Sequence, residues 1–309
     1  MDGPLKNLLV VDLTRVLVGP YCTMILSDLG ARVIKVEAPE IGDDSRKFGP
    51  FVEDYSAYFM SLNRGKESIA LNLKNSNDKK IFDKILSKAD ILVENFKPGT
   101  LKKWGYGWED VNKKFPKLIY ASASGFGQTG PLKELPAYDM VVQGMGGLMS
   151  VTGQPNSEPT RVGTSIGDIT AGLFTTIGIN AALYDRQKTG KGMYIDVSML
   201  DCQIAILENA IARYLSKNEI PKPMGSRHPS IAPFEAFKTK DSYIIIAAGN
   251  DKLFEKLCNI LEVPEMFSDE KFNSNSSRAK HMDELKTIIE NKLSAKSTNE
   301  WVSQMEKDK

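Results

Sequence analysis

Short apolar runs alternate with amphipathic stretches through the first part of the chain. Runs rich in Val, Ile and Leu predict strands over 7–13, 32–37, 68–73, 90–96 and 117–124. Apolar residues at helical spacing predict helices over 20–30, 76–89 and 107–114. Strands that alternate with helices across short loops predict an α/β fold with a doubly wound, mostly parallel, Rossmann-like sheet.

The pattern changes after residue 150. Apolar positions between Asp168 and Gln187 predict a long buried helix, followed by a strand over 190–199 and a helix over 200–216. A stretch rich in Pro, Gly and Ser at 218–233 marks a domain boundary. Beyond it we expect a strand–turn–strand unit and two or three helices. The sequence therefore predicts a large domain over 1–224 and a smaller α+β domain over 225–309.

Composition narrows the class of protein. Apolar residues make up 41% of the chain, charged residues make up 26%, and the net charge is +1. These values predict a soluble protein without a nucleic-acid partner. No apolar run reaches the roughly 20 residues that span a bilayer, and the N-terminus does not resemble a signal peptide, so we expect no membrane partner.

The cysteines and histidines add two expectations. Cys22, Cys202 and Cys258 are scattered and odd in number, which favours reduced thiols and a cytoplasmic location. His228 and His281 are far apart in the sequence, which argues against a histidine-based metal site. We therefore predict no metal.

The stretch "TRVGTSIGDITAG" holds two candidate nucleophiles. Ser165 stands in a G-x-S-x-G pattern between Gly163 and Gly167, which would form a nucleophile elbow only if a strand came directly before it. The preceding residues are polar and include proline, so we favour helix capping by Ser165 or Thr164 over a hydrolase.

Asp168 follows one residue after this pattern. In the first turn of the predicted helix, its carboxylate either stabilises the helix dipole or serves as a covalent nucleophile toward an activated acyl group. Spacing alone favours the first interpretation and leaves the second open.

Basic residues follow several predicted strand ends in the first domain. In an open α/β sheet, ligands bind beyond the carboxyl ends of the strands. Some of these side chains are candidates for phosphate contacts, although solvated surface lysines fit the pattern equally well. The set comprises Arg64, Lys66, Lys74, Lys97, Lys102 and Lys103.

The sequence resembles the class III CoA-transferases, the family of formyl-CoA transferase and carnitine CoA-transferase. The resemblance runs in order over nearly the whole chain and is specific because of that order. The matching stretches are "VVDLTRVLVGPYCTMILSDLGARVIKVE", "NRGKESIALNLK", "ILVENFKPGTLKKWG", "SGFGQTGP", "GDITAG", "ALYDRQKTGKGMYIDVSMLD" and "RHPSIAPFEAF".

The resemblance implies that Asp168 is the nucleophile. In that family the carboxylate attacks an acyl-CoA donor, passes through an aspartyl anhydride and an aspartyl-CoA thioester, and finally gives CoA to a free carboxylic acid. The partners implied are an acyl-CoA, which brings coenzyme A as part of the substrate, and a small carboxylic acid. Neither metal nor ATP is required.

The resemblance also implies a set of CoA contacts. Two basic contacts of formyl-CoA transferase become Ala38 and Pro136 here, and an arginine becomes Lys103. Lys103 keeps the charge but loses the planar fork of the guanidinium. The implied contacts are Val16, Leu17 and Val18 near the pantetheine, Leu71, Asn72, Leu73 and Lys74 near the adenine, and Asn95, Phe96, Lys103 and Tyr138.

Family members form an interlocked homodimer and are longer than this chain. Their last segment returns from the small domain to the large one, and this sequence ends before that segment. We therefore expect either a truncated form or a sequence from which part of the protein is missing. Two further alternatives stay open. One is an acyl-CoA racemase of the same fold, whose histidine is replaced here by Tyr138. The other is a CoA-binding protein without turnover.

Overall fold

The computed structural model describes residues 2–307, which form two compact units. The first unit contains Met1–Ser150 and Thr160–Pro221, and the second contains Val151–Pro159 and Lys222–Lys309. The change of unit after Pro221 lies within the proline- and glycine-rich stretch at 218–233.

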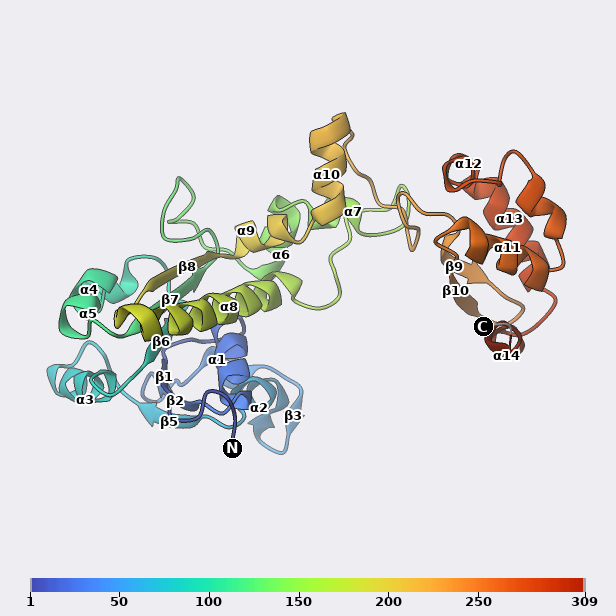
Figure 1. Ribbon diagram of the computed structural model, residues 1–309. Helices are drawn as coiled ribbons and strands as arrows, with labels where there is room; N and C mark the ends of the chain where they lie inside the picture. Colours follow the sequence, from blue (N-terminus) through green and yellow to red (C-terminus); the bar gives the residue numbers. More distant parts are fainter. Residues whose placement is uncertain (1, 308–309) are drawn as a thin grey trace. The chain divides into compact units, whose positions relative to one another are not determined.

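A six-stranded sheet forms the centre of the first unit (Figure 1). Its spatial order is β5-β2-β1-β6-β7-β8, and all five neighbouring pairs are parallel. The predicted α/β fold with a parallel sheet is therefore confirmed. The strands are β1 (Leu9–Asp12), β2 (Arg32–Glu37), β5 (Glu67–Ala70), β6 (Ile91–Glu94), β7 (Ile119–Ser124) and β8 (Tyr194–Ser198).

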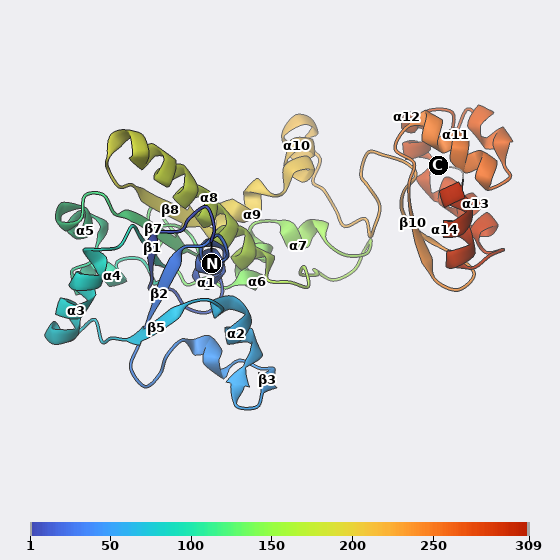
Figure 2. The same cartoon turned by 60° about the horizontal axis from the view of Figure 1, so that its bottom comes forward.

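Helices cover both faces of this sheet (Figures 1 and 2). Val10 on β1 packs into a cluster with α1 and α8, whereas its neighbour Val11 packs on the opposite face with α3, α4 and α5. Successive residues of a strand point to opposite faces, so a strand covered on both sides is apolar throughout. The covering helices are α1 (Val18–Asp28), α3 (Ser76–Leu86), α4 (Thr100–Trp104), α5 (Trp108–Lys114) and α8 (Ile166–Thr189).

The remaining elements of the first unit lie in the connections. The helix predicted over 200–216 is in fact two helices, α9 and α10, which are separated at Ile206 and Leu207. No glycine or proline marks that break in the sequence, so the apolar pattern does not reveal it. The elements are η1 (Asp44–Lys47), β3 (Phe51–Val52), β4 (Tyr55–Ser56), α2 (Ala57–Asn63), α6 (Asp139–Met145), α7 (Leu148–Val151), α9 (Met199–Ala205) and α10 (Glu208–Lys217).

Helix α8 is the longest helix of the described part of the chain. By length and composition alone it would be able to cross a membrane, and it is the one helix within residues 2–307 of which this is true. Its Ile179 and Ala182 are buried against the sheet together with α1. A core helix passes the same test of length and composition.

The second unit is built on a two-stranded antiparallel sheet, β9 (Phe234–Lys238) and β10 (Tyr243–Ala247). Its core gathers Phe237, Ile246, Phe254 and Trp301. The fully buried guanidinium of Arg278 donates to the carbonyl oxygens of Ala232 and Phe272 and to the Asp251 carboxylate. The helices are α11 (Asp251–Ile260), η2 (Pro264–Ser268), α12 (Asn275–Lys280), α13 (Met282–Leu293) and α14 (Thr298–Lys307).

Four charged side chains are buried at the carboxyl ends of β1 and β2. Lys35 lies 2.9 Å from the Asp43 carboxylate, and Lys66 lies 3.1 Å from that of Asp12. Burial opposes ionisation of Asp12, but Lys35, Lys66 and two threonine hydroxyls outweigh it and hold the pKa of this carboxyl below its usual range. Lys35 also donates to the carbonyl oxygen of Thr14 at 2.7 Å, so the cluster fixes the loop that follows β1.

We expect Lys35→Met to destabilise the first unit strongly. The substitution leaves the buried Asp43 carboxylate without its cation, and loss of one partner of a buried pair costs about 3–5 kcal/mol. Urea unfolding in a Trp301→Phe background, in which the fluorescence comes from Trp104 and Trp108 of the first unit, measures the free energy of unfolding. Lys35→Met combined with Asp43→Asn should recover part of the loss.

A matched control is Arg32→Met, which breaks an ion pair with Glu67 that is more than half exposed. Exposed pairs contribute at most about 1 kcal/mol. If Lys35→Met and Arg32→Met lowered the free energy of unfolding equally, the importance given to the buried cluster would be contradicted.

Candidate active site

The site lies where the strand order of the sheet reverses. From β1 the chain winds outward through β2 to β5, and on the other side it winds through β6 and β7 to β8. Loops after β1 and β6 therefore run in opposite directions and leave a crevice beyond the carboxyl ends of these two strands. The loop after β1 contains Arg15 and Val16, and the loop after β6 contains Asn95 and Phe96.

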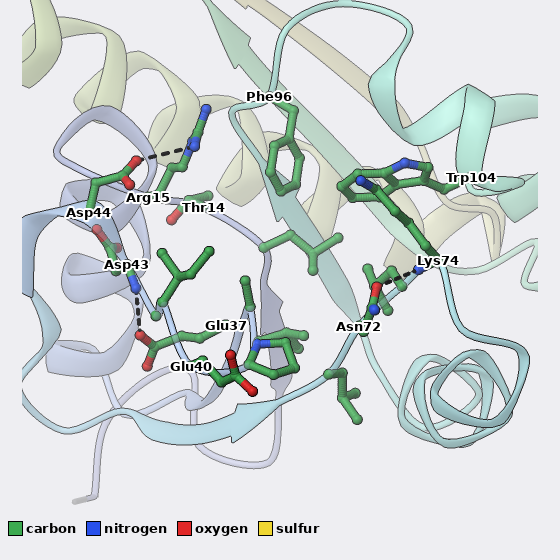
Figure 3. Close-up of a pocket in the computed structure, with 18 residues that line it drawn as sticks. Thr14, Arg15, Glu37, Glu40, Asp43, Asp44, Asn72, Lys74, Phe96 and Trp104 are labelled. Atoms are coloured by element: carbon green, nitrogen blue, oxygen red, sulfur yellow. Dashed lines mark hydrogen bonds and ion pairs between the residues drawn. The ribbon is translucent and has the colours of Figure 1, made fainter.

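Two neighbouring cavities occupy this region. The first has a volume of about 600 Å³ and extends from the β1 loop to Asn72, Lys74 and Trp104 (Figure 3). The second has a volume of about 270 Å³ and reaches Tyr138 and Asp168. The two cavities share three lining residues, Arg15, Asp44 and Phe96. Together they form a path from the outer strands of the sheet to the start of α8.

The structure brings nearly all the predicted site residues onto this path, and their roles stay predictions. Lys103 is the exception, since it is exposed on α4 and lines neither cavity. The first cavity is lined by Leu71, Asn72, Leu73, Lys74 and Phe96, and the second by Val16, Leu17, Val18, Asn95, Phe96, Tyr138 and Asp168.

The start of α8 is held by a side chain from another helix. Ser165 is the N-cap residue, but its side chain makes no capping hydrogen bond. Instead the Asp139 carboxylate accepts from the backbone N–H of Gly167 at 2.7 Å. The prediction that Ser165 caps the helix through its hydroxyl is therefore wrong, because a carboxylate distant in the sequence takes that role. The described residues 152–165, which lead directly into α8, contain no strand, so a nucleophile elbow is also contradicted.

Gln143 extends this arrangement. Its side-chain N–H donates to the second oxygen of Asp139 at 2.7 Å, while its carbonyl oxygen accepts from the N–H of Val162 at 2.9 Å. Gln143 is fully buried. Asp139 and Gln143 on α6 thus hold the first turn of α8 and the segment before it. Both carboxylate oxygens of Asp139 accept a hydrogen bond, and the amide of Gln143 both donates and accepts one.

Asp168 is a partly buried carboxyl in that first turn. Burial and, to a smaller extent, the neighbouring Asp139 carboxylate together raise its pKa to about 7. A carboxyl with such a pKa is a mixture of acid and carboxylate near neutral pH. Perturbation of this kind in a cavity is typical of functional groups.

Two glycines allow this close approach of elements. A Cβ atom on Gly172 would lie 2.8 Å from the carbonyl oxygen of Val18, so α8 packs closely against the first turn of α1. A Cβ atom on Gly167 would lie 2.7 Å from the Val142 side chain on α6. The glycines beside Asp168 therefore bring the starts of α1, α6 and α8 together.

Two residues near this path were missed in the sequence. The Tyr58 hydroxyl on α2 has its pKa raised to about 12, first by burial and then by Asp168, so it lies within electrostatic reach of that carboxyl. Helix α2 was not predicted, so no signal pointed to Tyr58. Arg15 precedes the implied contact Val16 directly, and that adjacency was the available signal.

The described residues contain no group of three or more His, Cys, Asp or Glu side chains able to hold a metal ion. His228 stacks on Phe234, and a ring nitrogen of His281 lies 2.9 Å from the Ser277 carbonyl oxygen. Both histidines belong to the second unit. The three cysteines are free and buried.

Comparison with known proteins gives a consistent assignment. The family model described as "CoA-transferase family III" matches residues 5–309. The chain is 49% identical to an acetyl-CoA:oxalate CoA-transferase of Acetobacter aceti, over 99% of this chain and 79% of that protein. It is 43% identical to the human succinyl-CoA:glutarate CoA-transferase, over 97% of this chain and 68% of that protein.

Two solved structures are similar over nearly the whole chain. A CAIB/BAIF family protein from Brucella suis has a TM-score of 0.87 and 41% identity, and the match covers 99% of this chain and 82% of that one. A protein from Mycobacterium tuberculosis has a TM-score of 0.89 and 30% identity, with the same two coverages.

We expect Asp139→Asn to lower the pKa of Asp168. The variant keeps an oxygen that accepts from the N–H of Gly167. It removes the negative charge of Asp139, which in the parent protein favours protonation of Asp168. A ¹³C NMR titration of labelled aspartate carboxyls, compared with Asp168→Asn for assignment, measures this pKa directly. At pH 7 a larger fraction of Asp168 should be ionised in the variant than in the parent protein.

The control is Asp185→Asn, which removes a carboxylate near the other end of the same helix. It should leave the Asp168 titration unchanged. An unchanged titration in Asp139→Asn would mean that burial alone raises the pKa.

Proposed function

The chain belongs to CoA-transferase family III, and on that premise we propose that Asp168 is the nucleophile that moves CoA from an acyl-CoA donor to a free carboxylic acid. The observation that carries this proposal is the position of Asp168. Its carboxyl lines the same cavity as the loop after β1, at the inner end of the path through the crevice. It also stands in the first turn of α8, where the helix dipole offsets part of the penalty that burial and Asp139 impose on its ionised form.

The first half of the reaction frees the donor acid. A carboxylate oxygen of Asp168 attacks the thioester carbonyl carbon, the C–S bond breaks, and CoA leaves as a thiolate. The product on the enzyme is a mixed anhydride of Asp168 and the donor acyl group. The thiolate then attacks the Asp168 carbonyl carbon of the anhydride, which releases the donor as a carboxylate and leaves an aspartyl-CoA thioester.

The second half runs in the opposite sense with the acceptor. The acceptor carboxylate attacks the carbonyl carbon of the aspartyl-CoA thioester and expels the thiolate, which gives a second anhydride. The thiolate attacks the acceptor carbonyl carbon of that anhydride, so that the new acyl-CoA leaves and the Asp168 carboxylate is restored. Each step exchanges one activated acyl bond for another, so the sequence is balanced without an external source of energy.

The two cavities suit the two ends of CoA. We place the adenosine in the first cavity, near Asn72 and Lys74, and the pantetheine in the second, along Val16 and Asn95. This arrangement directs the thioester toward Asp168. The named relatives act on small acids, oxalate in one case and glutarate in another. We therefore expect small dicarboxylic acids among the donors and acceptors.

Asp168→Ala should abolish transfer, whereas Ser165→Ala should retain it. The loss expected for removal of a covalent nucleophile is on the order of 10³-fold or more in kcat. A panel of acyl-CoA donors and free acids, assayed by mass spectrometry for new thioesters, measures transfer. Hydroxylamine should trap the acyl-enzyme as a hydroxamate of Asp168, identified by peptide mapping.

Other outcomes would sink this assignment. Transfer that survives Asp168→Ala rules out the nucleophile, and loss on Ser165→Ala alone with release of free acid would favour a hydrolase. Deuterium exchange at the α-carbon of a branched acyl-CoA without transfer would favour a racemase.

We also propose a homodimer, supported by apolar side chains that lie exposed on α8. Ile177 is 62% exposed, and Leu173 and Phe174 nearby are also exposed. An exposed apolar stripe of this kind on a core helix fits contact with a second copy of the chain.

Ile177→Glu should shift the chain toward the monomer. The change places a charge in the proposed contact, where it has no partner and its desolvation opposes association. Light scattering coupled to size-exclusion chromatography measures the mass. Ile81→Glu on α3, also at an exposed apolar position, serves as the control and should leave the mass unchanged. A parent protein that is monomeric at micromolar concentration would refute the dimer.

A further inference from the structure

Arg15 stands where the two cavities meet. It lines both of them, as do Asp44 and Phe96. If the adenosine of CoA occupies the first cavity and the pantetheine the second, as proposed above, the diphosphate that joins them crosses this junction. On the basis of that proposed function, a side chain at this junction meets the diphosphate.

The backbone of Arg15 is fixed from two directions. Its N–H donates to the side-chain oxygen of Asn95 at 2.9 Å, and its carbonyl oxygen accepts from the side-chain N–H of Asn95 at 2.8 Å. The carbonyl oxygen of Thr14 is held by the buried Lys35, and the N–H of Val16 donates to Asp43 at 3.1 Å. The loop therefore presents the Arg15 side chain from a rigid base.

The guanidinium itself is free to exchange partners. It lies 3.1 Å from the Asp44 carboxylate, and the two side chains are 53% and 46% exposed. Its central carbon lies 5.8 Å from the centre of the Phe96 ring (Figure 3). An ion pair this exposed is weak, because water screens it and two side chains lose freedom. A better anion can displace Asp44 at little cost.

Several charged side chains near the junction already have close partners. Glu37 binds Arg46 in a two-pronged pair at 2.7 Å, and Asp43 pairs with Lys35. Lys74 lines the far side of the first cavity. Lys97 lines the second cavity, where it lies 3.7 Å from the Glu134 carboxylate, but it does not line the first. Among the described residues, Arg15 is thus the cation that lines both cavities.

We propose that Arg15 binds the diphosphate of the acyl-CoA, and that Asp44 is the counter-ion it leaves when the substrate arrives. A guanidinium presents paired N–H donors that match two phosphate oxygens, whereas a monodentate contact to Asp44 uses one. The Phe96 ring, 5.8 Å from the central carbon of the guanidinium, adds a cation–π attraction that does not depend on which anion is bound. Asp44 therefore competes with substrate and keeps the empty site from holding other anions.

Calorimetry with CoA itself, on the full chain, tests this without turnover. Arg15→Gln should weaken CoA binding about 10- to 100-fold, the loss expected for hydrogen bonds to a charged group. The CoA affinity of Arg15→Lys should fall between that of the parent protein and that of Arg15→Gln, because the charge remains but the planar fork of N–H donors is lost. Asp44→Asn should tighten binding by about threefold, since a weak competing pair is removed.

Two matched controls separate this from general charge effects. Arg32 and Glu67 form a similarly exposed pair on the outer strands, and neither lines the cavities. Arg32→Gln and Glu67→Gln should leave CoA affinity unchanged. ³¹P NMR of bound CoA then identifies the contact, because Arg15→Gln should move the diphosphate resonances and leave that of the 3′-phosphate in place.

The outcomes are distinct. Unchanged CoA affinity in Arg15→Gln, or a shift confined to the 3′-phosphate resonance, overturns the role of Arg15 while the transferase proposal stands. A parent protein that does not bind CoA at all overturns both. A tightening in Asp44→Asn that also appears in Glu67→Gln refutes Asp44 as the specific competitor.

Discussion

The active-site crevice depends on one buried arrangement of charge at the carboxyl ends of β1 and β2. Asp12, Lys35, Asp43 and Lys66 are almost fully removed from water, which costs several kcal/mol for each ion unless partners compensate. The ion pairs compensate for this loss of hydration. Lys35 and Asp43 also form hydrogen bonds with backbone groups of the β1 loop. That loop holds Val16 at a φ of +67°, a strained conformation for a β-branched residue. The strain persists because the charge cluster leaves the loop no alternative.

A second constraint operates at the start of α8. The N-terminal N–H groups of a helix need acceptors, and here Asp139 supplies one from another helix. The same carboxylate then stands close enough to Asp168 to raise its pKa. Asp139 therefore completes the hydrogen bonding of the helix and disfavours the ionised form of Asp168. The position of the Asp139 carboxylate thus affects both the stability of the helix start and the ionisation of Asp168.

The sequence predicts those features that depend on neighbouring residues. The strand over 32–37 coincides with β2, and the helix over 168–187 lies within α8, because buried strands and long helices leave regular apolar patterns. The capping of α8 was not predictable in this way, since Asp139 lies 28 residues before its hydrogen-bond partner. The same holds for Tyr58, whose proximity to Asp168 arises only from packing. Spacing alone favours a structural role for Asp168. Only the resemblance to a family predicts that it acts as a covalent nucleophile.

These environments also bear on the proposed role of the Asp168 carboxylate as a nucleophile. Burial and the Asp139 carboxylate disfavour the ionised form of Asp168 and raise its pKa to about 7. In the proposed anhydride and thioester intermediates this carboxyl is neutral, so it no longer repels Asp139 and no longer requires solvation as an ion. The site therefore raises the free energy of the free carboxylate relative to the acylated enzyme. The cost is that less of the enzyme is ionised at low pH, and the gain is that the covalent intermediates lie closer in free energy to the free enzyme.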